Sequence, residues 1–525
     1  MFAWSFAAAW TLPRHSTATA GASHTLMRFM MIPLGATAPT VWVMGIPWAL
    51  RDPAKLGEHT LVKRVANLPM RAADSHGGTA PVARLMQVMV AVGGAVSAWQ
   101  TILIPAVDAM SEPQSAGPVP STFAELPRLL AAAPHRPLFL AGTIAVLLSM
   151  AWWAVELTWM RFGLGGWPQP SIPPGWAHAM LVQYGLFPLF MFGFLLTTFP
   201  RWLGRPDLPW TRYVPVAGCV FGGYVLANVG LLDLPWLLKL GVAVMLVGYL
   251  IGVWTLAGVL RASVAERKSH ARSCLAALSL GCLGLVVFLA YLFGAPEDCA
   301  LLAIKLGTYG LLLPIYFSVM HRMLPFFTGN MVKGYEVIRP DWSLPVVWVL
   351  LLAHLLLEWR GALGWLWLVD VPLALVFAWH ALTWQPWRAM RPGLLAVLHL
   401  AFAWLPVAFV LYAVQDVVYA ASGHLVLGRA PLHALGIGFF GSMLVAMVTR
   451  VTQGHSGRPL QMGKVAWLCF GLLQVVALLR IRAELGGDVY LWLVIAAYGW
   501  LLAFLPWVLR SAWIYLTPRA DGKPG

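Results

Sequence analysis

The chain has 525 residues, of which 60% are hydrophobic and only 10% are charged. Soluble domains carry roughly 25% charged residues, so this chain has too little charge to cover a water-soluble globule. The apolar residues also form blocks of about twenty, the length of a helix that crosses a bilayer. The net charge of +15 is spread over short loops without a dense Lys/Arg run, which argues against a nucleic-acid partner and favours a membrane protein.

Residues 1–130 form an extension whose role the sequence leaves open. Stretches 29–50 and 85–107 are apolar enough to span, but prolines interrupt the first and a basic loop separates the two. If both crossed the bilayer, the basic loop would lie outside, so we expect at least one of them to be interfacial or buried. The first residues lack a basic segment, which argues against a cleaved signal peptide.

From residue 134 to 515 the apolar pattern predicts one all-α membrane domain of twelve transmembrane helices, followed by a cytoplasmic tail over 516–525. The expected spans are 137–159, 177–199, 213–232, 235–260, 273–294, 300–320, 343–357, 362–384, 393–415, 431–450, 465–480 and 489–510.

The distribution of basic residues predicts the orientation. Lys and Arg concentrate in the loops after spans two, four, six, eight and ten and in the C-terminal tail. The remaining loops hold only Arg161, Lys239, Arg360, Arg429, Arg480 and Arg482. Because basic loops stay in the cytoplasm, both ends of the twelve-helix domain are expected there.

Histidines at the ends of predicted spans are the candidate cofactor ligands, because imidazole binds haem iron and transition metals. His178 and His433 open spans two and ten at the outer face. His321, His399 and His455 belong to the cytoplasmic side. The alternative is that each histidine only hydrogen-bonds a helix end, and for His354 and His380 packing is the favoured interpretation.

Three arginines follow at the cytoplasmic ends of spans six and ten: Arg322, Arg450 and Arg458. Guanidinium groups suit anionic groups such as haem propionates, although they also anchor helix ends. The methionines in these spans are soft enough for copper(I), but most are expected to pack. The five cysteines form no CxxC pair and are expected to be small buried hydrophobic residues.

Spans two and ten share a pattern. Each opens with a histidine, and Gly-Arg-Pro follows at Gly204–Pro206 and at Gly457–Pro459. Both spans run in the same direction, so they are candidates for equivalent partners that face one site. Since they are not six helices apart, a simple duplication of halves is excluded.

These residues carry a resemblance to a known family. The run from His433 (HALG) through Met447 (MVTRVT) to Gly454 (GHSGRPL), with Arg322 (RMLPFFT), His399 and Pro134 (PHRPLFL), resembles the NnrS family over about residues 134–515. That resemblance implies a bacterial inner-membrane protein of the nitric-oxide and nitrosative-stress response, linked to denitrification, which binds haem b and copper. It also implies nitric oxide as a small gaseous ligand and lipid as the surroundings.

One departure concerns copper. The family's second helix usually opens with HAHEM, whereas this chain has Trp176, His178 and Ala179 where the first histidine, the second histidine and the glutamate are expected. The copper expectation is therefore weaker than the haem expectation, and His178 with His433 is the favoured ligand pair.

Two other functions stay open. One is a redox enzyme resembling a haem–copper oxidase or nitric-oxide reductase, although the chain lacks the adjacent His-His pair and the H-P-E motif of those enzymes. The other is a cofactor-free transporter in which Pro188, Gly193 and Pro314 break helices, and Glu156, Lys305 and Asp370 bind or relay ions.

Overall fold

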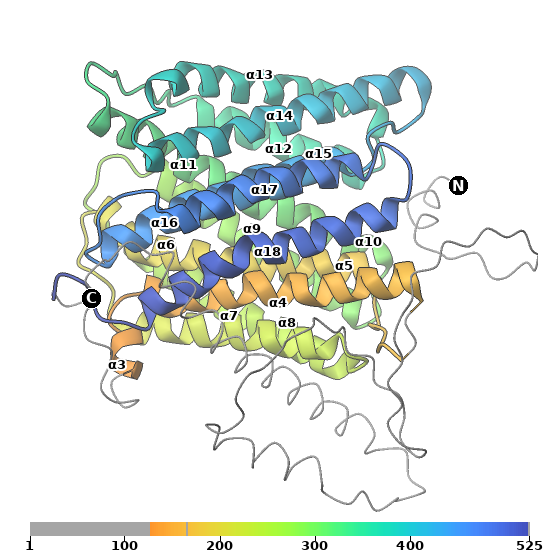
Figure 1. The fold of residues 1–525 in the computed structure, drawn as a ribbon, viewed down its shortest axis with the longest axis horizontal. Coiled ribbons are helices and arrows are strands. Elements are labelled where there is room, and N and C mark those ends of the chain that lie inside the picture. Colours follow the sequence, from red (N-terminus) through yellow and green to blue (C-terminus); the bar gives the residue numbers. More distant parts are fainter. Residues whose placement is uncertain (1–125, 164–165, 523–525) are drawn as a thin grey trace, which may run out of the picture. The chain divides into compact units, whose positions relative to one another are not determined.

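The computed structural model describes residues 126–163 and 166–522, so the apolar stretches 29–50 and 85–107 lie outside the described residues. Eleven helices in this part of the chain are long and apolar enough to cross a membrane. The seventh predicted span, a seventeen-residue helix that continues through Glu358 to Trp359, is shorter. The expected multi-pass helical membrane protein is confirmed, and the helices lie side by side in one bundle (Figure 1).

The bundle is built from three consecutive units of four spans. The first unit contains α4 (His135–Phe162), α5 (Pro174–Met180) with α6 (Phe187–Trp202), α7 (Trp210–Gly230) and α8 (Pro235–Arg261). The second contains α9 (Ser269–Leu292), α10 (Glu297–Lys305) with α11 (Leu313–Met331), α12 (Ser343–Trp359) and α13 (Trp367–Thr383). The third contains α14 (Gly393–Ser422), α15 (Ala430–His433) with α16 (Ser442–His455), α17 (Lys464–Arg482) and α18 (Val489–Tyr515). Short helices at α3 (Leu126–Leu130), η3 (Leu363–Trp365) and η4 (Pro386–Arg388) lie in the connections.

The second span of every unit contains a π-helical segment. These segments are η1 (Leu181–Leu186), η2 (Leu306–Leu312) and η5 (Ala434–Gly441). Spans two and ten are thus equivalent, as their shared pattern suggested, and span six is the third member. The repeat unit is therefore four helices rather than six.

Proline accounts for the first π segment. Pro188 has no N–H, so the carbonyl of Tyr184 four residues earlier loses its helical partner. The Tyr249 hydroxyl on α8 donates to that carbonyl at 2.8 Å, which replaces the lost hydrogen bond. Pro314 follows η2 in the same way, whereas η5 contains Gly436, Gly438 and Gly441 instead.

The three π-containing spans form the centre of the bundle. About 83% of the apolar window in Pro174–Trp202 is buried, and 78% in Glu297–Met331 and in Ala430–His455, against 39% in α8. Neighbouring units pack through α8 with α9, α13 with α14, and α18 with α4. The central spans are therefore shielded from lipid and can carry polar side chains.

All spans run between two ends of the bundle. We call the end where α4 begins and α6, α11 and α16 finish the basic end, because Arg201, Arg322 and Arg450 lie there. The opposite end, where α5, α10 and α15 begin, is the far end.

Candidate cofactor site

The first and third central spans each place a histidine at the far end. His178 lies in the last turn of α5, three residues before η1 begins, and His433 is the last residue of α15, directly before η5. π-helical turns within α-helices often occur at functional sites. The repeat therefore brings the two histidines to the same level of the bundle.

His178 has a ring nitrogen available for a ligand. Its imidazole stacks on the Trp153 indole of α4, with ring centroids 4.6 Å apart and an interplanar angle of 14°. Its Nδ1 atom is buried and has no hydrogen-bond partner among the described residues. Since a buried polar atom without a partner is costly, this nitrogen fits a ligand to a metal.

His433 is oriented by its own helix. Its Nδ1 is 2.9 Å from the Arg429 carbonyl, which only accepts, so Nδ1–H donates and Nε2 keeps its lone pair. Metal-bound histidines commonly use this arrangement. The two imidazoles are close enough to interact electrostatically, and the guanidinium groups of Arg429 and Arg480 act on both.

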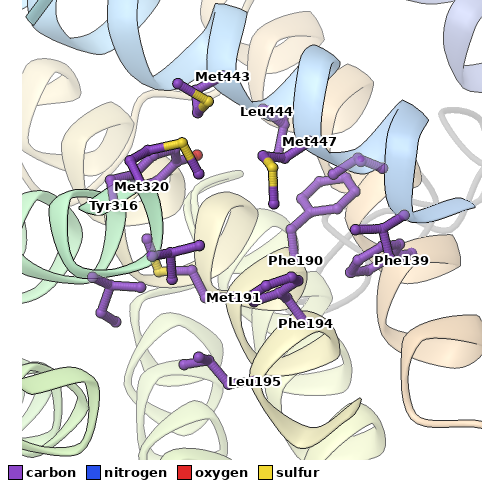
Figure 2. Close-up of a pocket in the computed structure, with 14 residues that line it drawn as sticks. Phe139, Phe190, Met191, Phe194, Leu195, Tyr316, Met320, Met443, Leu444 and Met447 are labelled. Atoms are coloured by element: carbon purple, nitrogen blue, oxygen red, sulfur yellow. The ribbon is translucent and has the colours of Figure 1, made fainter. Parts of the chain in front are cut away.

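A small apolar cavity lies between the three central spans. Its volume is about 60 Å³, and it is lined from α4, α6, α11 and α16. The thioethers of Met191, Met320, Met443 and Met447 converge on it among aromatic rings, as Figure 2 shows. The hydroxyl of Tyr316 donates to the Phe440 carbonyl at 3.3 Å, so this polar group is satisfied. The cavity suits a small apolar guest.

The histidine pair and the cavity occupy different depths. Phe190 and Met443 lie ten to twelve residues beyond His178 and His433, which is about 15–18 Å along a helix towards the basic end. Neither histidine lines the cavity. Four of the methionines from the central spans line this cavity: Met191, Met320, Met443 and Met447.

The three histidines predicted for the cytoplasmic side do not share a site. His399 Nε2 lies 2.9 Å from the Thr328 hydroxyl. His321 Nδ1 lies 3.0 Å from Nε2 of His270, and the His455 ring lies 4.5 Å from the ring of His135. Each histidine of the trio thus has its own neighbour.

Two of those neighbours were not singled out in the sequence. His135 sits in the PHRPLFL motif at the start of α4, and its buried Nδ1 has no hydrogen-bond partner in the described chain. The adjacent His135 and Arg136 in that motif were the sequence feature that could have indicated this histidine. His270 is the second residue of α9, and nothing in its local sequence marks it as a candidate ligand.

The three arginines lie at the basic end. Arg322 lies over the Trp202 ring at 4.7 Å, and Arg450 over the Phe327 ring at 4.0 Å. One guanidinium nitrogen of Arg458 is buried without a partner among residues 126–163 and 166–522. Burial and the nearby Arg510 lower the pKa of Arg458, so this positive charge would be stabilised by an anionic group.

The residues fit haem better than copper. A two-histidine set with free ring nitrogens fits haem iron. In the described ranges, no group of three or more His, Cys, Asp or Glu side chains could hold a metal ion. Trp176, which replaces the first histidine of the family pattern, packs edge-on against Tyr291 with centroids 5.5 Å apart. The family pattern of the second helix is therefore incomplete in this chain.

Comparison with known proteins gives one family. Neither the curated proteins nor the solved structures contain a match to this chain. The family model described as NnrS protein matches residues 129–519, which is most of the chain. The chain therefore belongs to the NnrS family of multi-pass membrane proteins.

Proposed function

We propose that this protein binds haem b at the far end of the bundle and serves in the response to nitric oxide. Family membership supports a membrane protein of that response. The observation that carries the haem assignment is the pair His178 and His433, which lie just before the π segment of the second span in two repeat units and have ring nitrogens available.

In this proposal His178 and His433 are the haem ligands. Trp153 orients the first imidazole by stacking, and the Arg429 carbonyl orients the second. Bound haem iron would supply the ability to bind nitric oxide. Arg322, Arg450 and Arg458 lie at the opposite, basic end, so they are candidates for anionic groups other than the propionates of this haem.

The apolar cavity would serve the gaseous ligand. Nitric oxide is small and nearly apolar, so a cavity lined by methionines and aromatic rings holds it without loss of hydrogen bonds. We place the protein in a bacterial inner membrane with the basic end in the cytoplasm, because basic loops stay on that side.

The test is an absorption spectrum with metal analysis of the full-length protein in detergent. We expect a Soret band that changes when nitric oxide is added. His178→Ala and His433→Ala should each lose most of the haem, whereas His424→Ala, in the exposed loop before α15, should keep it. Size-exclusion profiles check that the variants are folded.

The outcomes separate two claims. A purified protein without a Soret band would overturn haem binding. Full haem content in both His178→Ala and His433→Ala would overturn the ligand assignment and direct attention to His321, His399 and His455.

A further inference from the structure

A cluster of five ionisable side chains lies in the far-end half of the bundle, and neither candidate haem ligand belongs to it. Its members come from four neighbouring spans: Lys305, His354, Glu358, Asp370 and Asp416. His354 was expected only to pack. Ionisable groups at membrane depth cost free energy, so such a cluster calls for a functional explanation.

The His354 imidazole connects two carboxylates. Its Nδ1 lies 2.7 Å from Oδ1 of Asp370, and its Nε2 lies 3.3 Å from Oε2 of Glu358. Glu358 also pairs with the Lys305 ammonium. Since a neutral imidazole carries only one N–H, it can donate to one carboxylate at a time. Transfer between its two nitrogens is how histidine passes a proton on.

Asp416 adds a third carboxyl. Asp416 is buried on α14, which packs against the α13 helix that carries Asp370, and the two carboxyls interact electrostatically. Two neighbouring carboxylates do not both stay ionised, because the repulsion between their negative charges favours a proton on one of them. Two tyrosines beside the cluster form a hydrogen bond with each other: the Tyr309 hydroxyl donates to the Tyr412 hydroxyl at 3.0 Å. The Tyr309 ring also packs on the His354 imidazole.

The charge balance also requires a proton. Three carboxyls face two possible cations, Lys305 and a protonated His354. With Lys305 charged, neutrality requires two protons: one on a carboxyl and one on the imidazole, or both on carboxyls when the imidazole is neutral. Four buried atoms of the cluster lack a hydrogen-bond partner in the described chain: Nε2 of His354, Oε2 of Glu358, and Oδ2 of both Asp370 and Asp416. The 3.3 Å approach of Glu358 to His354 is therefore an ion-pair contact without a hydrogen bond, and it leaves both atoms able to take up a proton.

Exposure decreases along the cluster. The side chains of Lys305 and Glu358 are 24% and 17% exposed, whereas those of His354 and Asp370 are 1% and 0% exposed. Trp359, Trp365 and Trp367 are exposed beside Glu358, and tryptophans are enriched at membrane–water interfaces. Glu358 thus lies at the level of the interface and Asp370 in the interior.

We propose that this cluster is a proton site: the Asp370–Asp416 carboxyl pair holds an exchangeable proton that enters from the far face through Glu358 and His354. Glu358 takes the proton from water and passes it to Nε2 of His354. As Nε2 gains it, Nδ1 gives its proton to Asp370. No electron moves, and one proton enters for each one stored. The site does not depend on haem.

The first experiment compares infrared spectra of the full-length protein in lipid. Asp416→Asn is close in shape to a protonated aspartate, so the fold should persist. We expect the wild-type spectrum at neutral pH to contain a protonated-carboxyl stretch that Asp416→Asn removes. Glu156→Gln, which changes a buried carboxyl on α4 bonded to Trp167, is the matched control and should keep the Asp416-dependent band.

The second experiment tests the route. On transfer to D₂O, the Asp416-dependent band should shift more slowly in Glu358→Gln than in wild type, because the outermost proton acceptor is lost. Absence of the band in wild type would overturn the proton site and leave structural ion pairs. An unchanged exchange rate in Glu358→Gln would overturn the route from the far face.

Discussion

Single histidines illustrate how much a side chain reveals before its neighbours are known. His178 and His433 stand out in the sequence because each opens a span of the same pattern. His135 and His270 do not, because their importance comes from His455 and His321, which lie far along the chain. His354 was underestimated because its closer carboxylate partner, Asp370, lies on the next helix, although Glu358 is only four residues further along the helix of His354 itself.

Asp488 allows a prediction about stability and pH at the far end. Arg161 donates from Nε to Oδ2 of Asp488 at 2.8 Å, and the Leu491 N–H donates to Oδ1 at 3.0 Å as an N-cap of α18. The hydrogen bond from Arg161, followed by that from Leu491, lowers the pKa of Asp488. The folded state therefore gains stability at pH values above the unfolded pKa of about 3.9, and loses it as the pH falls through the lowered pKa.

We expect Asp488→Ala to lower the melting temperature slightly at pH 7 and much less near pH 3, as measured by thermal unfolding in detergent. The control is a double-mutant cycle with Arg161→Ala, in which the two effects should overlap. Fully additive losses, or a loss that persists at low pH, would show that the pair does not act as described.

At the level of the helix, close packing of α7 on α8 is the clearest constraint. A Cβ at Gly223 would come within 2.5 Å of the Met245 backbone nitrogen and 2.6 Å of the Gly241 carbonyl oxygen. Those atoms belong to the backbone of α8 and cannot move aside as a flexible side chain would. Gly222, the preceding residue, has nothing within 4 Å of the same position.

Gly223→Ala should therefore destabilise the protein by about 1–3 kcal/mol, the usual cost of overpacking. Gly222→Ala provides the matched control and should be neutral or stabilising by up to about 1 kcal/mol. Unfolding of both variants in the same detergent gives the comparison. Equal stability of the two would mean that α7 and α8 are not in contact at Gly223.

The π-helical segments are a feature of the helices that the sequence analysis did not predict. Gln183–Leu186 and Thr308–Leu311 share Tyr-Gly-Leu ahead of a proline, and this similarity between spans two and six was available in the sequence. It was missed because the third member, η5, has no proline and reads as an ordinary apolar run. Only the backbone of all three spans identifies the four-helix repeat.

For the whole molecule, the distribution of charge predicts how the bundle sits in the membrane. A fluorescent protein fused after residue 525, which folds only in the cytoplasm, should fluoresce in cells. The same reporter placed after residue 295, in the far-end turn between α9 and α10, should not. The reversed result would place the basic end outside and would contradict the orientation.

Composition and periodicity alone determined that the chain is a multi-pass helical membrane protein, with the spans near their observed positions. These properties depend on hydrophobicity over about twenty residues, which is a local quantity. The central position of the second span in each unit, the methionine-lined cavity and the cluster around His354 depend on helices that are distant in sequence. Hydropathy cannot report them, because a side chain that faces lipid and one that faces another helix are equally apolar. Packing between the repeat units decides which side chains face lipid and which face another helix.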